Sequence, residues 1–65
     1  MDNRIKVLRA EKNWSQQALA DKIGVSRQAV NAVERGKHDP SLQFAFNIAN
    51  QFNQSIEDIF FPEKK

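Results

Sequence analysis

Cysteine is absent from this chain of 65 residues, and no apolar run in it is long enough to span a bilayer. The missing thiols exclude a disulfide framework, a thiolate zinc site and a cysteine nucleophile, and nothing in the chain calls for an oxidising compartment. The charged start, MDNRIKVLRAEK, lacks the apolar core of a signal peptide. We therefore expect a cytoplasmic protein that does not enter a membrane.

The residue types of common active sites are also scarce. The chain has one histidine, no glycine-rich phosphate loop and no pair of acidic residues expected to face inward. These absences argue against an enzyme, and no metal, cofactor or small-molecule ligand is evident. His38 lies in a predicted loop, where a lone histidine is usually solvated, and we assign it no role.

A chain of 65 residues has room for one domain with one core. A domain of this size buries about 60% of the surface that its unfolded form exposes, so a partner chain would add useful stability. We expect a single domain over residues 1–65, with an ordered core from about residue 3 to residue 61. The residues from Pro62 onward are expected to fray.

The positive charge lies in the first part of the chain. The whole chain carries only +2, with an isoelectric point near 9.3. Up to Lys37, eight lysines and arginines face four acidic residues, a net +4, whereas two lysines face four acidic residues after Lys37, a net −2. This distribution indicates that a negatively charged partner would meet the first part of the chain.

Apolar residues recur at helical intervals, and strand-like alternation never persists. The sequence therefore predicts an all-α fold without strands, made of five short helices at residues 4–12, 15–24, 26–35, 41–52 and 55–60. Serine hydroxyls can cap the first turn of a helix, and the last four helices start at Ser15, Ser26, Ser41 and Ser55. Gly24 can adopt the left-handed conformation that ends the second helix and begins a sharp turn.

The inward faces follow from the same periodicity. In the first helix we expect Ile5, Leu8 and Val7 to face the core, and in the fourth the stripe Leu42, Ala45, Ile48, Ala49 and Phe52. The second and third helices are expected to bury Leu19, Ile23, Val25, Val30 and Val33. Ala20 offers a small side chain where these two helices must approach closely.

Residues 16–35, QQALADKIGVSRQAVNAVER, resemble the helix-turn-helix of the phage Cro and repressor (Xre-like) family. The resemblance continues through PSL at 40–42 and IEDIF at 56–60, and so covers almost the whole chain. It implies a lambda-repressor-like DNA-binding domain with the helix-turn-helix at the second and third helices. It also implies a sequence-specific transcriptional regulator of double-stranded DNA, acting as a repressor, that reads the major groove with the third helix.

The outward face of the third predicted helix carries the side chains that read bases. Arginine can pair with guanine, glutamine or asparagine can pair with adenine, and an alanine methyl can touch the thymine methyl. The resemblance implies base contacts by Arg27, Gln28 and Asn31, to which we add Ala32. On an isolated helix the same residues would simply be solvated. The tight turn and the serine cap that hold this helix favour the DNA-reading interpretation.

Phosphate contacts are expected from groups that flank the third helix. Gln16 is the leading candidate, because it lies in the first turn of the second helix and the matching glutamine of the family touches phosphate and steadies the recognition glutamine, here Gln28. Further candidates, each of which could equally be a cap or a solvated charge, are Ser15, Ser26, Arg35 and Lys37. Lys37 is followed by His38, Asp39 and Pro40, so this loop lacks the several basic residues that some relatives carry.

The resemblance also implies a partly buried salt bridge between Arg9 in the first helix and Glu34 at the end of the third. Such a pair would tie the scaffold together, and losing one partner would strand the other charge.

The phenylalanines near the C-terminal end suggest a second surface. We expect Phe46, Phe60 and Phe61 to form a two-fold dimer interface, although the C-terminal tail could instead pack on the core. A homodimer would place two recognition helices about 34 Å apart and imply a palindromic operator. The alternative function is a protein-interaction module, such as an antitoxin or a phage-derived adaptor. The polar third helix favours DNA over a protein groove.

Overall fold

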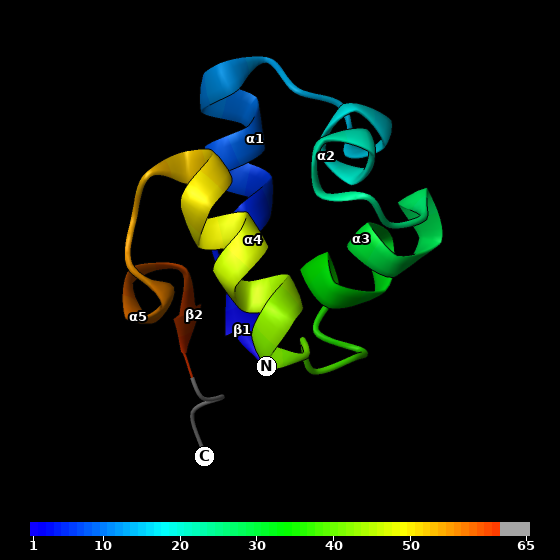
Figure 1. Ribbon diagram of the computed structural model, residues 1–65. Coiled ribbons are helices and arrows are strands. Elements are labelled where there is room, and N and C mark those ends of the chain that lie inside the picture. Colours follow the sequence, from blue (N-terminus) through cyan, green and yellow to red (C-terminus); the bar gives the residue numbers. More distant parts are fainter. Residues whose placement is uncertain (62–65) are drawn as a thin grey trace.

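The structure, a computed structural model, describes residues 1–61. Figure 1 shows the order of its elements. Within the described residues they are β1 (Asp2–Asn3), α1 (Ile5–Lys12), α2 (Gln16–Ile23), α3 (Arg27–Glu34), α4 (Leu42–Phe52), α5 (Ile56–Ile59) and β2 (Phe60–Phe61). The predicted five-helix, all-α architecture is confirmed, and the expected fraying from Pro62 lies outside the described residues.

Serines begin the helices as the sequence predicted, with one difference. The hydroxyl oxygens of Ser15, Ser26 and Ser41 accept hydrogen bonds from backbone N–H groups three residues later, at 2.9, 3.1 and 3.1 Å. Each of these bonds satisfies an N–H group that the first helical turn leaves without an intrahelical acceptor. Ser55 occupies the same position before α5, but its hydroxyl makes no capping bond to any residue that the structure describes.

Two asparagines and a glycine end α1, α4 and α2. Asn13 after α1 and Asn53 after α4 have φ angles of 59° and 55°, in the left-handed region that asparagine tolerates better than most residues. Gly24 ends α2 with a φ of 73°, where a residue with a Cβ would be strained. At each of these three positions the left-handed backbone turns the chain out of its helix.

The helices enclose one apolar core. α4 lies across α1, while α2 and α3 lie together on one side of α4, and α5 with β2 lies on the other (Figure 1). The buried apolar residues are Ile5, Leu8, Leu19, Ala20, Val30, Val33, Phe44, Ala45, Ile48, Ala49, Phe52, Ile59 and Phe60. Every helix of the described chain contributes at least one of them, so the orientation of each helix depends on this core.

Two predicted core residues are exposed. Val7 lies two residues beyond the fully buried Ile5, which on a helix turns it to the opposite side. Leu42 is 68% exposed, because the buried stripe of α4 includes Phe44 in its place. Both predictions were therefore wrong, and Leu42 presents a large apolar side chain to solvent.

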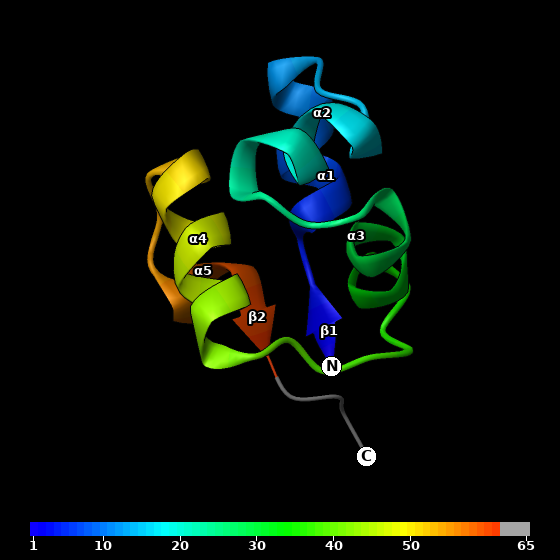
Figure 2. The ribbon, with the colours of Figure 1, turned by 45° about the vertical axis from the view of Figure 1, so that its right-hand side comes forward.

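The expectation of no strand was also wrong. β1 and β2 pair antiparallel, with Asp2 opposite Phe61 and Asn3 opposite Phe60. Phe60 therefore lies in extended backbone and not in the last helix, and alternation along the strand turns its side chain into the core. This pairing joins the two ends of the described chain, close to the N-terminus in Figure 2.

Candidate nucleic-acid interface

The turn between α2 and α3 fixes how α3 projects. The backbone N–H groups of Gly24 and Val25 both donate to the carbonyl oxygen of Ala20, which closes the end of α2. Ala20 is fully buried, and its methyl group allows the two helices to approach closely. Val30 and Val33 bury the inner face of α3, so its outer face is held rigidly at the edge of the molecule (Figure 2).

The four predicted base readers share the outer part of α3. Arg27 and Gln28 are exposed in its first turn, and Asn31 and Ala32 are half-buried one turn later. The side chains together offer a guanidinium, two amides and a methyl group. This set can pair with guanine and adenine edges and can contact a thymine methyl group.

An ion pair lies directly behind this face. The Arg9 guanidinium donates through Nε to Oε2 of Glu34 and through Nη2 to Oε1, the latter at 3.0 Å. The two side chains are only 14% and 5% exposed. The hydrogen bond with Glu34 raises the pKa of Arg9 above its ordinary value and outweighs the opposing effect of burial. Arg9 also donates through Nη1 to the carbonyl oxygen of Trp14 at 2.8 Å, so this one side chain joins α1, α3 and the start of α2.

Gln16 connects the ion pair to Asn31, one of the predicted base readers of α3. Its Nε2 donates to Oε1 of Glu34 at 3.2 Å, and its Oε1 accepts from Nδ2 of Asn31 at 3.5 Å. The resemblance implied that Gln16 steadies Gln28, but the amide of Gln16 bonds to Asn31 and Glu34 instead. The link from Gln16 to Asn31 was missed from the sequence, because residues 15 positions apart meet only once α2 and α3 have packed.

The predicted phosphate contacts surround the base readers. Ser15 and Ser26 are exposed at the starts of α2 and α3, and each hydroxyl keeps its own hydrogen for donation while its oxygen caps the helix. Gln16 is half-buried beside Ser15. Arg35 and Lys37 are exposed just after α3. These five groups therefore border the α3 face at both of its ends.

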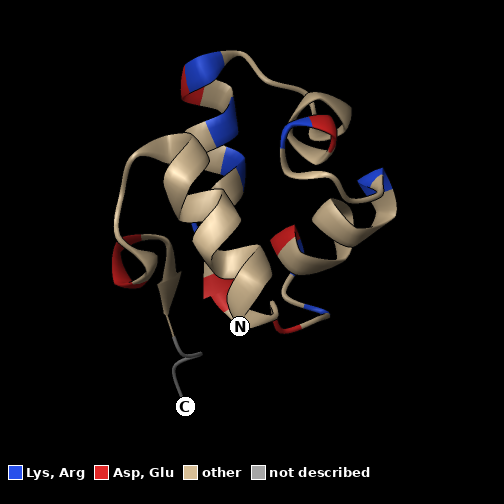
Figure 3. Cartoon of the chain, viewed as in Figure 1, with Lys and Arg blue, Asp and Glu red and all other residues tan. Residues whose placement is uncertain are grey.

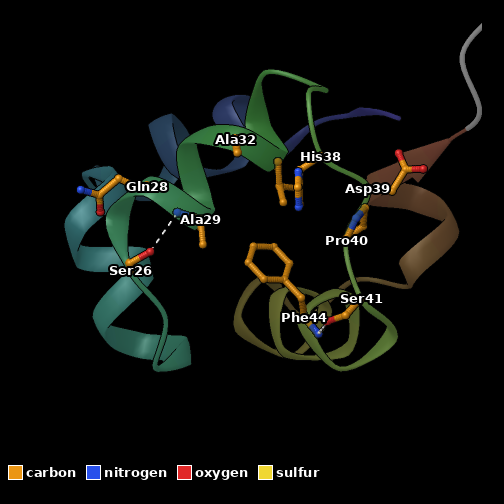
Figure 4. A pocket seen from close by; sticks show the side chains of 10 residues that line it. Ser26, Gln28, Ala29, Ala32, His38, Asp39, Pro40, Ser41 and Phe44 are labelled. Carbon is orange, nitrogen blue, oxygen red and sulfur yellow. Dashed lines mark hydrogen bonds between the residues drawn. The ribbon is translucent and has the colours of Figure 1, made fainter.

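The loop after α3 adds His38, which was expected to be solvated and to have no role. His38 lines a groove that also includes Gln28 and Ala32 of α3 and Ser41 and Phe44 near the start of α4. Figure 4 shows the His38 side chain pointing into this groove. Its position depends on the path of the loop, which no feature of the sequence beyond Pro40 predicts.

Charged residues are unevenly distributed among the helices. No charged residue occurs between residues 40 and 56, so α4 is uncharged throughout (Figure 3). Lysines and arginines occur instead on α1, α2 and α3 and just after α3. Within residues 1–61, no helix is long and apolar enough to cross a membrane, and no three acidic or histidine side chains form a metal site.

The predicted interface residues separate into two kinds. Phe60 is 6% exposed and belongs to the core, so the prediction that it contributes to a dimer interface was wrong. Strand pairing with β1 is the physical reason, because it directs this side chain inward. Phe46 and Phe61 remain 50% and 38% exposed, and Leu42 lies one helical turn before Phe46 on α4.

Comparisons with known proteins agree with this geometry. A family model described as helix-turn-helix matches residues 5–59. The chain is 54% identical over 63 residues to an uncharacterized HTH-type transcriptional regulator of Methanocaldococcus jannaschii, covering 97% of this chain and 96% of the relative.

Two solved structures have the same fold. The restriction-modification controller protein C.AhdI from Aeromonas hydrophila is 33% identical, with 88% of this chain and 86% of that chain covered and a TM-score of 0.79. SinR, the master regulator for biofilm formation in complex with DNA, is 34% identical, with 83% and 87% covered and a TM-score of 0.75. The N-terminal DNA-binding domain of SinR from Bacillus subtilis has also been solved separately. Since the match extends over nearly every described residue and includes both helices of the motif, the chain belongs to the Xre-like helix-turn-helix family of transcriptional regulators.

Proposed function

We propose that this DNA-binding regulator inserts α3 into the major groove of an operator and acts as a repressor. One observation carries the proposal: the outer face of α3 presents polar side chains at the edge of the molecule, while its inner face is locked in the core. Arg27, Gln28 and Asn31 read base edges, and Ala32 contacts a thymine methyl group. We expect the protein to bind DNA and not to act as an enzyme. We also expect the protein to lie in the cytoplasm with its DNA.

The flanking groups hold the backbone of the DNA. Ser15, Gln16 and Ser26 donate to phosphates at the starts of α2 and α3, where free N–H groups and the helix dipoles favour an anion. Arg35 and Lys37 supply positive charge at the other end of α3. These contacts set the position of α3 on the duplex and make the affinity depend on salt, but they carry no sequence information.

We further propose that two copies bind together through α4. Leu42 and Phe46 form an exposed apolar pair, and Phe61 adds to the apolar surface elsewhere on the chain. Charged residues are depleted at the centres of protein interfaces, as they are throughout residues 40–56. A homodimer about a two-fold axis would present two α3 helices about 34 Å apart and would require a palindromic operator.

A protein-interaction module is the second candidate function, and the apolar pair on α4 is the observation that favours it. An antitoxin or an adaptor would use this surface for another protein. The two candidates are compatible, because α3 and the exposed residues of α4 are separate surfaces. An equimolar complex with a different protein, formed without any effect on DNA binding, would favour the second candidate.

Fluorescence anisotropy tests the DNA-binding proposal. The labelled duplex is taken from upstream of the gene, and the titration is repeated at several salt concentrations and against scrambled competitor. We expect specific binding to exceed non-specific binding by about a thousandfold or more and to weaken steeply with salt. Equal affinity for the upstream and scrambled duplexes at every salt concentration would contradict a sequence-specific function.

A further inference from the structure

A continuous chain of hydrogen bonds runs from the interior to the reading face of α3. It begins at Arg9, passes through Glu34 and Gln16, and ends at Asn31. Its donors converge on the Glu34 carboxylate, with Arg9 donating from one side and Gln16, which accepts from Asn31, donating from the other. Within residues 1–61, no buried side-chain nitrogen or oxygen lacks a hydrogen-bond partner.

The Arg9–Glu34 ion pair determines the orientation of the Gln16 and Asn31 amides in this hydrogen-bond chain. Ionised Glu34 can only accept hydrogen bonds, so Gln16 must turn its Nε2 toward it and its Oε1 away. Its Oε1 is then an acceptor, and of the two ends of the Asn31 amide only the Nδ2 can face it favourably. The reversed amide of Gln16 would place an oxygen against a carboxylate, which is strongly unfavourable.

We infer that Gln16 and Glu34 are positioning residues that hold the amide of Asn31 in the one orientation that recognises adenine. This inference rests on the proposed role of Asn31 in reading bases. With one Nδ2 hydrogen committed to Gln16, Asn31 retains its Oδ1 and a second Nδ2 hydrogen. Adenine presents the matching pair, an N7 acceptor beside an N6 donor, whereas guanine presents two acceptors.

The orientation matters because a fixed base accepts only one order of donor and acceptor. A flipped Asn31 would place its oxygen against adenine N7 and its NH₂ group against the adenine NH₂. The hydrogen-bond chain therefore does more than stiffen the side chain. It removes the wrong orientation before DNA binds, so the cost of ordering is met when the protein folds.

Selection from a pool of randomised duplexes, with sequencing of the bound fraction, tests the inference. Asn31→Ala identifies the position that Asn31 reads, and the unaltered chain should prefer adenine there by about tenfold or more. Gln16→Lys replaces the amide by a donor-only group that still pairs with Glu34 but attracts Oδ1 of Asn31. We expect this variant to lose most of the adenine preference at that position and to keep the preferences at the other positions. Gln16→Leu should give a smaller loss.

Gln17→Lys is the matched control. It adds the same charge one residue later, at an exposed side chain whose amide bonds only to Asp21 of its own helix. Both lysine variants should bind duplexes of random sequence more tightly because each adds a positive charge, but only Gln16→Lys should change the preference. If both variants leave the adenine preference intact, Gln16 is only a phosphate contact and the inference is overturned.

The remaining outcomes separate the inference from the proposed function. If the unaltered chain selects no sequence at all, base reading by α3 fails and the inference fails with it. A sequence preference with another base at the Asn31 position, or with no position sensitive to Asn31→Ala, overturns the inference alone.

A measurement without DNA provides an independent test. In a ¹⁵N-labelled chain, the resonances of the two Nδ2 protons of Asn31 should differ from those of a solvated amide, because one proton is bonded to Gln16. Gln16→Leu should bring them toward the values of a solvated amide, and Gln17→Leu should not. Unchanged Asn31 resonances in Gln16→Leu would overturn the proposed chain of hydrogen bonds.

Discussion

α3 and α4 both expose one face, but the two faces differ in kind. α3 presents a guanidinium and two amides, one of which, Asn31, is supported from behind by a hydrogen bond. α4 instead presents Leu42 and Phe46 and carries no charge along the helix (Figure 3). A polar face of this kind suits a charged, hydrogen-bonding partner such as DNA. An uncharged apolar face suits a second protein surface, because removing apolar surface from water is favourable and no charge has to be desolvated. The proposed DNA contact and the proposed protein contact therefore use different faces of one small domain.

Breaking the support behind α3 should have the largest effect. Glu34→Ala leaves the Arg9 guanidinium largely buried without its partner, and we expect it to lower the free energy of unfolding by about 3 to 5 kcal/mol. A domain of this size has little more stability than that, so much of the variant should be unfolded. Urea denaturation followed by the single tryptophan, Trp14, measures the change.

A double variant serves as the control for this effect. Arg9→Met with Glu34→Leu removes both charges and fills the space with apolar groups, so most of the stability should return. If Glu34→Ala alone were as stable as the unaltered chain, the ion pair would not anchor α3. Loss of DNA binding in Glu34→Ala reports unfolding, so it does not count as evidence for a DNA contact.

The apolar face of α4 is tested by removing it. Leu42→Ser with Phe46→Ser should weaken self-association by about 3 kcal/mol, since large side chains at the centre of an interface contribute most of its binding energy. At a concentration low enough for both proteins to be monomeric, the double variant should unfold at nearly the same urea concentration as the unaltered chain, because both side chains are already exposed. Sedimentation equilibrium over a range of concentrations gives the dissociation constant. A monomeric unaltered chain at tens of micromolar would contradict a dimer that forms without DNA.

The polar face of α3 should show a specific loss instead. Gln28→Ala removes an exposed side chain, so the fold should remain intact while binding to the cognate duplex weakens by about 1 to 3 kcal/mol. Its sequence preference should relax at one position in each half-site. Anisotropy titrations with cognate and scrambled duplexes measure both effects.

Lys37→Ala is the matching control for Gln28→Ala. Because Lys37 is proposed to contact phosphate, its loss should weaken all duplexes alike and reduce the salt dependence by about one ion. Equal losses on cognate and scrambled DNA for Gln28→Ala would show that Gln28 does not read a base.

The sequence predicted features that depend on near neighbours. The starts of α2, α3 and α4 follow from a serine and the three residues after it, and the end of α2 follows from Gly24. The pairing of β1 with β2 joins residues far apart in the chain over only two residues each, which is too short to leave a periodic pattern. The burial of Phe60 could not be predicted for the same reason.

The candidate site shows the same division. The outward residues of α3 could be placed from helical periodicity alone, since Val30 and Val33 fix which side is inward. The bonds of Gln16 to Glu34 and Asn31 could not, because they depend on the distance between two packed helices. His38 enters the groove beside α3 through the path of a loop, which no periodic pattern describes.

The smallest predicted effect separates two serines that look alike in the sequence. Ser41 starts α4 and its hydroxyl accepts from the Phe44 N–H at 3.1 Å, whereas the Ser55 hydroxyl, at the start of α5, has no such bond among the described residues. We therefore expect Ser41→Ala to cost about 1 kcal/mol and Ser55→Ala only a few tenths, as measured by urea denaturation of the two variants side by side. A lost cap on α4 leaves a backbone N–H without its acceptor at the end of the helix that contributes most to the core. Equal costs for the two variants would mean that the hydroxyl of Ser41 contributes nothing beyond its backbone conformation, which both serines share.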